Sequence, residues 1–487
     1  MTINQIINNF KENNPKADTT MIQLAYDFTV KAHSGQKRKN GEPYIQHCLH
    51  TAFILTQIKA DLATVIAGLL HDIPEDTEYS LADIAKDFGQ EIADLVEGIT
   101  KLSKIKYRGI ERYRESLRKM FLAMAHDLRV ILIKFADRLH NLRTLESLPL
   151  EKRQRIARET LEIYAPIAGL LGIWRLKWQM EDICFKHLYP EDYKKLAYKY
   201  EVEKKLEHNQ YIQKIKNMLG AKLKEAKIPF QITSRFKHLY SIYQKLQRKD
   251  RKFDEIYDVF ALRIVVPSIA DCYKTLGTIH SLWRPNPGRF KDYIAVPKPN
   301  GYQALHTTVY GPEKKSTEFQ IRTKEMDDGA KYGIAAHWYY KMGSFNKNLN
   351  KQPAWVKEVL HIQKETQDTS DFIKQIKFDV FKDRIFVFTP KGDVFDLPEG
   401  STPIDFAYYV HSDIGNRAVS ALVNDKIAPL SQELKNGDLV EIVTEKKRQG
   451  PSRDWLKFVK TATARTKIKQ NLKTSMLDNI KKFIPKI

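Results

Sequence analysis

Two stretches in the first third of the chain decide the fold of that region: Leu69-Leu70-His71-Asp72-Ile73-Pro74-Glu75-Asp76 and Lys134-Phe135-Ala136-Asp137-Arg138-Leu139-His140-Asn141-Leu142-Arg143. In each stretch, polar side chains of catalytic type follow an apolar run with helical spacing. His71 and Asp72 stand side by side near the end of one helix, and Asp137 ends the run RVILIKFA. A buried carboxylate needs a partner, and a metal ion would serve. With the upstream His47, these residues form a candidate divalent-metal site.

The donor types narrow the choice of metal, because imidazole nitrogen with carboxylate oxygen suits Mn²⁺, Fe²⁺ or Zn²⁺ better than Ca²⁺ or Mg²⁺. Pro74 removes a helical N–H, so it kinks or ends the helix. We expect that kink to direct Glu75 and Asp76 away from the metal ligands and toward substrate. There a carboxylate can take the proton of a metal-activated water. The alternative is a chance His-Asp pair, against which the combination with the other acids and His47 argues.

The bulk composition limits the class of protein. The 487 residues include 81 Lys+Arg against 59 Asp+Glu, a net charge of +22 that favours anionic partners such as nucleic acid or nucleotides. A generally basic surface is the alternative. The three cysteines, Cys48, Cys184 and Cys272, have no short spacing, which excludes a Cys-x-x-Cys zinc site and favours a reducing cytoplasm. The N-terminus does not resemble a signal peptide, and no apolar run approaches the roughly 18 residues of a membrane span.

The periodicity divides the chain into regions. Residues 1–200 read as almost wholly helical, with helical spacing over 49–73, 81–96, 115–145 and 155–180. After Pro229, short strand-like runs at 260–266, 306–311 and 317–323 alternate with helical stretches, which indicates an α/β domain. Residues 383–444 form a compact β-rich module with one small helix, PIDFAYYVH. The chain is therefore a multidomain α and α/β protein.

A second candidate site lies in the α/β region. The segment PNPGRFKDYIAVPKPNGYQALHT at 285–307 and the upstream runs carry many of the cationic donors that bind polyphosphate, namely Arg235, Lys237, Lys245, Arg263, Arg289, Lys291, Lys298 and His306. Tyr302 follows the turn dipeptide Asn300-Gly301, so a loop can present its ring to a base. Asp258 and Glu318 belong to adjacent strand segments, where two carboxylates can hold Mg²⁺ on a triphosphate and one can act as a base. The alternative is a solvated edge sheet with Tyr302 packed on it.

The first region resembles a known family. The runs AHSGQKRKNGEPYIQHCLHTAFIL, LLHDIPEDT, LVEGITKL and ILIKFADRLHNLRTL are similar to the hydrolase domain of RelA/SpoT-like alarmone enzymes. The resemblance implies an all-helical HD-type domain over residues 1–195 that removes the 3′-pyrophosphate of (p)ppGpp. It implies that Mn²⁺ is bound by His47, His71, Asp72 and Asp137, that water is activated by Glu75 and Asp76, and that nucleotide is held by Arg38, Lys39, Asn141 and Thr144. Cys48 stands where the family usually has Pro.

The second region resembles the synthetase domain of the same family. The matching runs are SRFKHLYSIYQKL, DEIYDVFALRIVV, LGTIHSLWRPNPGRFKDYIAVPKPNGYQALHTTVYGP, EFQIRT and YGIAAHWYYK. They imply a nucleotidyltransferase-like α/β domain over residues 226–345, behind a helical connector at 196–225. By that likeness Asp258 and Glu318 bind Mg²⁺, Glu318 deprotonates the 3′-hydroxyl of GDP or GTP, and Tyr302 stacks on guanine.

The remaining synthetase residues carry over as substrate contacts. Arg235, Lys237 and Lys245 would serve ATP, and the other substrate-binding positions are Arg263, Arg289, Lys291, Lys298, Asn300 and His306. The run Arg289-Phe290-Lys291-Asp292 matches the basic variant of bifunctional members. Four positions depart from the family pattern: Ser234 and Phe236 replace Gly and Pro, Asp327 replaces His, and Lys331 replaces Glu.

The third region, IFVFTPKGDVFDLPEGSTPIDFAYYVHSDIG, resembles a TGS module with a β-grasp fold. We expect it over residues 384–446, between a linker at 346–383 and a basic helical tail at 447–487. In the family this module contacts the 3′ end of uncharged tRNA, and His411 matches the contacting histidine; an ordinary surface histidine is the alternative. Long members continue into zinc-binding and ACT-type modules that this sequence does not include.

The resemblance as a whole implies a cytoplasmic, bifunctional enzyme of the stringent response. It would transfer pyrophosphate from ATP to the 3′-oxygen of GDP or GTP, and would hydrolyse (p)ppGpp again. One alternative is a hydrolase whose synthetase domain only senses nucleotides, which the departures at Ser234, Phe236 and Lys331 motivate. The other is a non-catalytic tRNA- or ribosome-binding regulator, which the +22 charge and the TGS-like module motivate.

Overall fold

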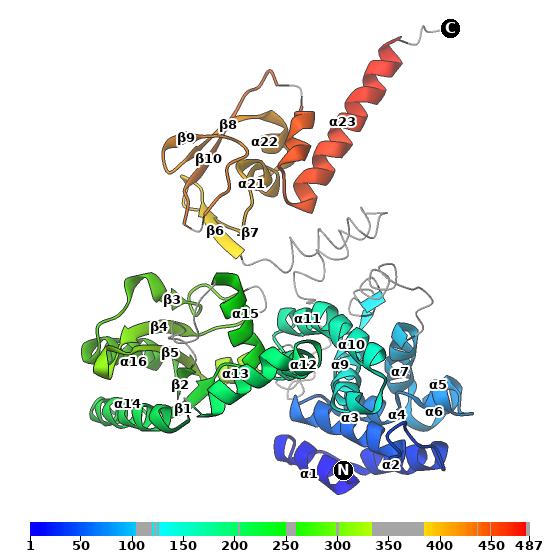
Figure 1. Ribbon diagram of the computed structural model, residues 1–487. Coiled ribbons are helices and arrows are strands. Elements are labelled where there is room, and N and C mark those ends of the chain that lie inside the picture. The colour runs from blue at the N-terminus through cyan, green and yellow to red at the C-terminus, as the bar shows by residue number, and fades with distance from the viewer. Residues whose placement is uncertain are drawn as a thin grey trace. The chain divides into compact units, whose positions relative to one another are not determined.

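The computed structural model divides the chain into two compact units, residues 1–105 with 126–347, and residues 106–125 with 348–487 (Figure 1). The structure describes residues 1–103, 119–120, 123, 126–202, 205–249, 260–298, 301–333, 384–435, 437–448 and 450–483. Each unit is considered by itself below.

The N-terminal part of the first unit is helical, as its apolar spacing predicted. Its helices are α1 (Ile3–Asn13), α2 (Thr20–Ala32), α3 (Ile45–Gln57), α4 (Leu62–Leu70), α5 (Ile73–Asp76), α6 (Leu81–Phe88), α7 (Gln90–Ser103), α9 (Leu128–Arg143), α10 (Leu150–Glu159), α11 (Ala165–Leu170), α12 (Trp174–Leu188) and α13 (Pro190–Val202). A π-helical turn, Thr160–Tyr164, joins α10 to α11. Among the described residues, no helix is long and apolar enough to cross a membrane.

Three of the expected continuous helices are broken, and one of them is 155–180, which is interrupted between α11 and α12 at Gly172 with its φ of 72°. The 49–73 segment divides into α3 and α4 around Lys59, which has a φ of 60°, and Asp61 caps α4 by accepting the N–H of Thr64. The 81–96 segment divides into α6 and α7 at Gly89, which has a φ of 91°. A positive φ cannot continue a right-handed helix, so each break turns the chain back toward the bundle.

The second part of the first unit is built on a five-stranded sheet in the order β1-β2-β5-β4-β3. The strands are β1 (Gln231–Phe236), β2 (Phe260–Val266), β3 (Lys291–Asp292), β4 (Leu305–Tyr310) and β5 (Ser316–Thr323), and the helices are α14 (Lys205–Glu225), α15 (Leu239–Lys249), α16 (Ile269–Leu282) and α17 (Lys324–Tyr332). Only β2 and β5 run parallel among the ladders of this sheet. The strands predicted at 260–266, 306–311 and 317–323 correspond to β2, β4 and β5.

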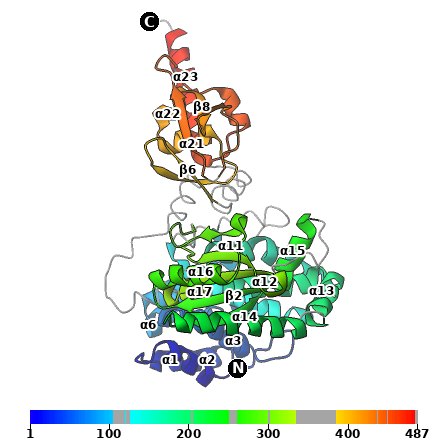
Figure 2. The same ribbon diagram turned by 90° about the vertical axis from the view of Figure 1, so that its left-hand side faces the viewer.

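One face of this sheet is covered by α14 and α16 (Figure 2). Leu262, Phe319 and Ile321 of the sheet pack with Ile215 and Leu219 of α14 in a single apolar cluster. Residues 205–225, which the sequence assigned to a connector, therefore belong to the core of the α/β domain. The helix looked like a connector because its lysines dominate the composition, whereas one buried stripe is enough to hold it.

The second unit contains the β-rich module. Its elements are β6 (Arg384–Phe388), β7 (Val394–Pro398), α21 (Pro403–Val410), α22 (Ser412–Arg417), β8 (Ala418–Val423), β9 (Lys426–Ala428), β10 (Val440–Thr444) and α23 (Ala462–Phe483). Asp405, inside the capping box of α21, also accepts the backbone N–H groups of Lys460 and Thr461. Trp455 and Ile468 share an apolar cluster with Tyr408. The start of the expected tail is thus packed onto the module.

Candidate active sites

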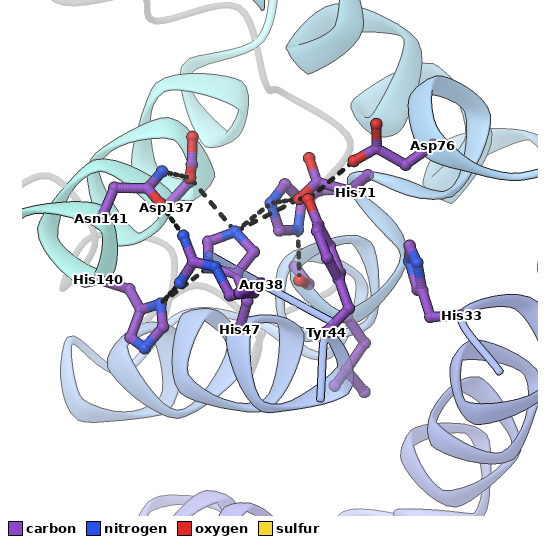
Figure 3. Close-up of polar contacts among 12 residues, drawn as sticks. His33, Arg38, Tyr44, His47, His71, Asp76, Asp137, His140 and Asn141 are labelled. Atoms are coloured by element: carbon purple, nitrogen blue, oxygen red, sulfur yellow. Dashed lines mark hydrogen bonds and ion pairs between the residues drawn. The ribbon is translucent and has the colours of Figure 1, made fainter. Parts of the chain in front are cut away.

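The first candidate site brings together the ends of several helices (Figure 3). His47 lies on α3, His71 ends α4, Asp72 precedes α5, and Asp137 lies on α9. One ligand atom from each of His47, His71 and Asp137 lies within 4.8 Å of the other two, and all three residues are buried. Asp72 Oδ2 is 3.3 Å from His47 Nε2 and 3.1 Å from His71 Nε2. The sequence-predicted ligand set therefore converges on one point.

Hydrogen bonds fix which nitrogen of each histidine is available. His71 Nδ1 is 2.9 Å from the carbonyl oxygen of Gly68, so it carries the proton and leaves the Nε2 lone pair free. Arg38 can only donate, and its Nη1 is 3.0 Å from His140 Nδ1, so that nitrogen accepts. His47 Nδ1, 2.8 Å from the same acceptor, must then be a donor. The two Nε2 atoms therefore face each other at 3.3 Å beside Asp72 Oδ2, an arrangement that a proton on His71 or a metal cation stabilises.

The charges around the site keep Asp72 ionised, but they also favour a proton on His71. Burial opposes ionisation of Asp72, yet His71 and His47 hold the pKa of Asp72 well below its usual range. Burial also opposes protonation of His71, but the Asp72 carboxylate raises its pKa to about 9, so a proton competes with a metal for this nitrogen. Burial and neighbouring charges lower the pKa of His140 to about 2, which keeps its ring neutral as an acceptor.

Tyr44 connects the predicted acidic pair to the ligands, contrary to the expectation for Asp76. The Tyr44 hydroxyl oxygen is 2.8 Å from Asp72 Oδ2 and 2.7 Å from Asp76 Oδ2 (Figure 3). Asp76 is therefore drawn toward the metal ligands rather than away from them, because α4 ends at Leu70 and α5 begins again at Ile73, beside Tyr44. Burial together with the two carboxylates raises the pKa of Tyr44, so its hydroxyl remains a donor. Glu75 is exposed one residue earlier.

The predicted nucleotide contacts surround the same point. Arg38 Nη2 donates to Asn141 Oδ1, and Asn141 Nδ2 donates to Asp137 Oδ1. Thr144 follows α9, and its hydroxyl is bound back to the carbonyl oxygens of the last turn. Lys39 is exposed in the turn after Arg38. Arg38 and Asn141 are thus joined to the metal ligands, while Lys39 and Thr144 lie at the rim.

Sequence reasoning missed two contributors to this site. Tyr44 precedes His47 by three residues, and this spacing of about one helical turn could have indicated that the two side chains are neighbours. Lys134 precedes Asp137 by the same spacing on α9, and its Nζ is 2.8 Å from Asp137 Oδ2. Burial opposes ionisation of Asp137, yet Lys134 and His47 lower its pKa. The ion pair occupies one carboxylate oxygen and leaves the other oxygen toward the histidines.

The second candidate site is the sheet face opposite α14 and α16. Strand alternation places Glu318, Gln320 and Arg322 of β5 on this face, since Phe319 and Ile321 are in the core. The register sets Gln320 opposite Arg263 of β2 and His306 of β4.

Polar contacts on this face close into a ring. Arg322 Nη2 donates to Gln320 Oε1 and Gln320 Nε2 donates to Glu318 Oε1, each at 2.9 Å. Glu318 Oε1 is 3.6 Å from His306 Nδ1, and His306 Nε2 is 2.7 Å from the Tyr302 hydroxyl. The Arg322 guanidinium lies 5.6 Å from the centre of the Tyr302 ring. Gln320 was not singled out from sequence, although its spacing of two from Glu318 places both on one face of a strand.

Two of the departures from the family pattern neutralise each other. Lys331 Nζ forms an ion pair with Asp327 Oδ2, four residues apart on α17. Asp327 Oδ1 also lies 3.5 Å from Arg263 Nε. Burial opposes ionisation of Asp327, but Lys331, Arg322 and Arg263 lower its pKa. The reversed charge at Lys331 is thus matched within its own helix.

The loop that carries Tyr302 has the expected turn. The N–H of Gly301 donates to the carbonyl oxygen of Lys298, and Gly301 has a φ of 76°, which suits glycine. Lys298 Nζ lies 5.0 Å from the Tyr293 ring centre. Arg289 and Lys291 are exposed on the preceding segment.

The other basic residues lie on the opposite edge of the sheet, and two predicted residues cannot be placed. Arg235 pairs in register with Ala261 at the end of β1, Lys237 precedes α15, and Lys245 lies on it. Asp258 and Asn300 lie outside the described residues. Ser234 is opposite Leu262 in β1, and Phe236 is opposite Phe260.

In the second unit, His411 is exposed between α21 and α22. Its Nδ1 accepts the N–H of Asp413 at 3.2 Å, so the outward Nε2 carries the proton of the neutral ring. The side chain therefore caps α22 and presents a donor to solvent. This position agrees equally with a contact residue and with a surface histidine.

Comparisons with known proteins match all three regions. An HD domain model matches residues 25–174, a region found in RelA / SpoT proteins matches 234–344, and a TGS domain matches 385–444. A "GTP pyrophosphokinase" of Myxococcus xanthus is 47% identical over 465 residues, which cover 94% of this chain and 61% of that protein. The chain spans about 60% of the length of this and other similar curated relatives.

Two further comparisons concern SpoT proteins. A solved structure described as "A metazoan ortholog of SpoT hydrolyzes ppGpp and plays a role in starvation responses" is 25% identical, has a TM-score of 0.29, and covers 35% of this chain and 97% of its own. The "Bifunctional (p)ppGpp synthase/hydrolase SpoT" of Escherichia coli (strain K12) is 45% identical over 483 residues, which cover 98% of this chain and 68% of that protein. With these three matching domain models and this identity over two thirds of a SpoT protein, the chain belongs to the RelA/SpoT family.

Proposed function

We propose that the chain is a bifunctional alarmone enzyme, a GTP/GDP pyrophosphokinase and a (p)ppGpp 3′-pyrophosphohydrolase. The observation that carries the hydrolase half is the convergence of His47 Nε2 and His71 Nε2, 3.3 Å apart, with the carboxylates of Asp72 and Asp137. Imidazole nitrogens and carboxylate oxygens gathered at one buried point offer a divalent ion its donor set. The relatives' printed names support both halves.

The hydrolase site would hold a divalent ion, with Mn²⁺ as the specific proposal for this nitrogen and oxygen donor set. Such an ion supplies a lowered pKa for a water molecule. Asp76 and Glu75 would accept its proton; for Asp76 this is supported by its exposure and by its connection to Asp72 through the Tyr44 hydroxyl. Arg38 would bind the nucleotide, a role that the Asn141 contact to its guanidinium supports.

The synthetase half is supported by the polar ring on the sheet face opposite α14 and α16. Glu318 would bind Mg²⁺ together with Asp258 and would accept the proton of the 3′-hydroxyl of GDP or GTP. Gln320 holds the Glu318 carboxylate, and His306 holds the Tyr302 hydroxyl. The Asp327–Lys331 ion pair argues against the hydrolase-only alternative, since the reversed charge does not remain unpaired near the site.

Uncharged tRNA is the partner we propose for the second unit. The exposed His411 Nε2–H can donate to a terminal ribose or base, and the chain carries a net charge of +22 that favours RNA. Ribosome contact through the same module is part of this proposal. We place the protein in the cytoplasm, where nucleotide substrates are available and its three buried cysteines remain reduced.

Two parallel reactions with purified protein test the two activities. One holds ATP, GDP and Mg²⁺, and the other holds ppGpp and Mn²⁺; products are resolved by anion-exchange chromatography. Asp72→Ala should abolish only breakdown, and Glu318→Ala should abolish only synthesis. Breakdown without synthesis would favour the hydrolase-only enzyme. Absence of both reactions, with retained tRNA binding, would favour the non-catalytic regulator.

A further inference from the structure

Helix α15, which carries Lys245 and begins two residues after Lys237, is held by helices of the N-terminal domain (Figure 2). Its buried Ile242 shares an apolar cluster with Phe185 of α12 and Leu196 of α13. That cluster is distinct from the one formed by the sheet with α14 and α16. The packing that positions α15 therefore comes from outside the synthetase sheet.

Aromatic contacts strengthen this attachment. The Phe185 ring lies 4.6 Å from Tyr243 and 5.7 Å from Tyr240, measured between ring centroids. At the start of α15, His238 stacks on Trp178 of α12, with centroids 4.6 Å apart and an interplanar angle of 6°. The start of α15 is thus packed against α12 through His238, Tyr240 and Tyr243.

The first turn of α15 is capped by a residue of α12. The first N–H groups of a helix have no acceptor within the helix. Asp182 Oδ1 accepts the N–H of Tyr240 at 3.0 Å, and the same carboxylate accepts the N–H of Leu239. His238, the residue before the helix, is not of a preferred capping type, and its ring is occupied with Trp178. Asp182 therefore supplies the cap that the local sequence lacks.

The carboxylate is also placed to complement the helix charge. Burial, with the neighbouring Glu181, raises the pKa of Asp182 to about 6, so the group is ionised at neutral pH. A negative charge at a helix N-terminus interacts favourably with the helix dipole. Because the Asp182 carboxylate already occupies the N-terminus of α15, we expect nucleotide phosphates to bind the basic side chains instead.

We propose that Asp182 is a positioning residue for the synthetase: by capping α15 it fixes Lys237 and Lys245, and with them the phosphates of ATP. The inference rests on the proposed synthetase function and extends it, because it makes the ATP side of that site depend on α12. The hydrolase ligands lie on other helices, so hydrolysis should not depend on this cap.

The test compares Asp182→Ala, Asp182→Asn and the control Glu181→Gln in the full chain. Glu181 is the adjacent carboxylate, and it pairs with Lys177 on its own helix. Loss of a cap should raise the KM for ATP about tenfold in the Ala variant. The KM for GDP and the rate of ppGpp hydrolysis should change less than about twofold. The Asn variant should retain the wild-type KM, since its side-chain oxygen accepts the same N–H groups.

Hydrogen exchange separates this inference from the proposed function. Amide exchange at Leu239 and Tyr240 should accelerate in the Ala variant and stay slow in the Asn and control variants. If the wild type bound ATP but made no alarmone, the synthetase assignment would fail, while ATP affinity would still test the cap. Unchanged exchange and unchanged ATP affinity in Asp182→Ala would overturn the inference, as would an Asn variant as impaired as the Ala variant.

Discussion

Replacement of Tyr44 by Phe tests the hydrolase geometry most directly. The change removes one hydroxyl that lies within 2.8 Å of both Asp72 and Asp76. The ring itself should stay, because it stacks on His33 with centroids 4.6 Å apart and meets the His47 ring edge-on. A hydrogen bond to a charged group contributes about 1.5–3 kcal/mol, which corresponds to roughly a 10- to 150-fold effect. The loss should appear in hydrolysis and in metal affinity.

The assay is ppGpp breakdown at limiting and saturating Mn²⁺, together with calorimetric Mn²⁺ titration of the metal-stripped protein. If saturating Mn²⁺ relieves the defect, the Tyr44 hydroxyl acts mainly through Asp72. If the defect persists at saturating Mn²⁺, the hydroxyl acts mainly through Asp76. Tyr79→Phe is the matched control, since its ring packs on Phe28 outside the ligand cluster. Hydrolysis within about twofold of wild type at both metal concentrations would refute the reasoning.

Three further predictions concern the rest of the first unit. The raised pKa of Asp182 means that its contribution to stability is present below pH about 4 and is lost as pH rises through about 6. Relative to Asp182→Asn, the wild type should thus lose up to about 3 kcal/mol of unfolding free energy by pH 7 in urea titrations. Gln320→Leu should release the Glu318 carboxylate and slow synthesis by roughly 10-fold without affecting hydrolysis; equal loss of both activities would contradict the polar ring. Asp327→Lys and Lys331→Asp should each impair synthesis, and the double variant should recover part of it, measured as a double-mutant cycle with coupling of about 0.5–3 kcal/mol.

The sequence by itself determined the elements whose signal is local. The strands at Phe260–Val266 and Ser316–Thr323 and the helix at Pro403–Val410 were predicted because apolar alternation, helical spacing and capping residues act over a few positions. The candidate metal ligands could also be selected from the sequence, since His71 with Asp72 and Asp137 each interrupt an apolar run in which a charge requires a partner.

The tertiary structure decided everything that depends on residues distant in sequence. The tautomer of His47 follows from Arg38 acting through His140, and the direction of Asp76 follows from Tyr44. The helix at 205–225 became part of a core only because a sheet formed beneath its one apolar stripe. Likewise, no local pattern shows that Asp182 caps α15. Such contacts depend on where whole helices pack, which is set by the sum of burial over the domain rather than by any short segment.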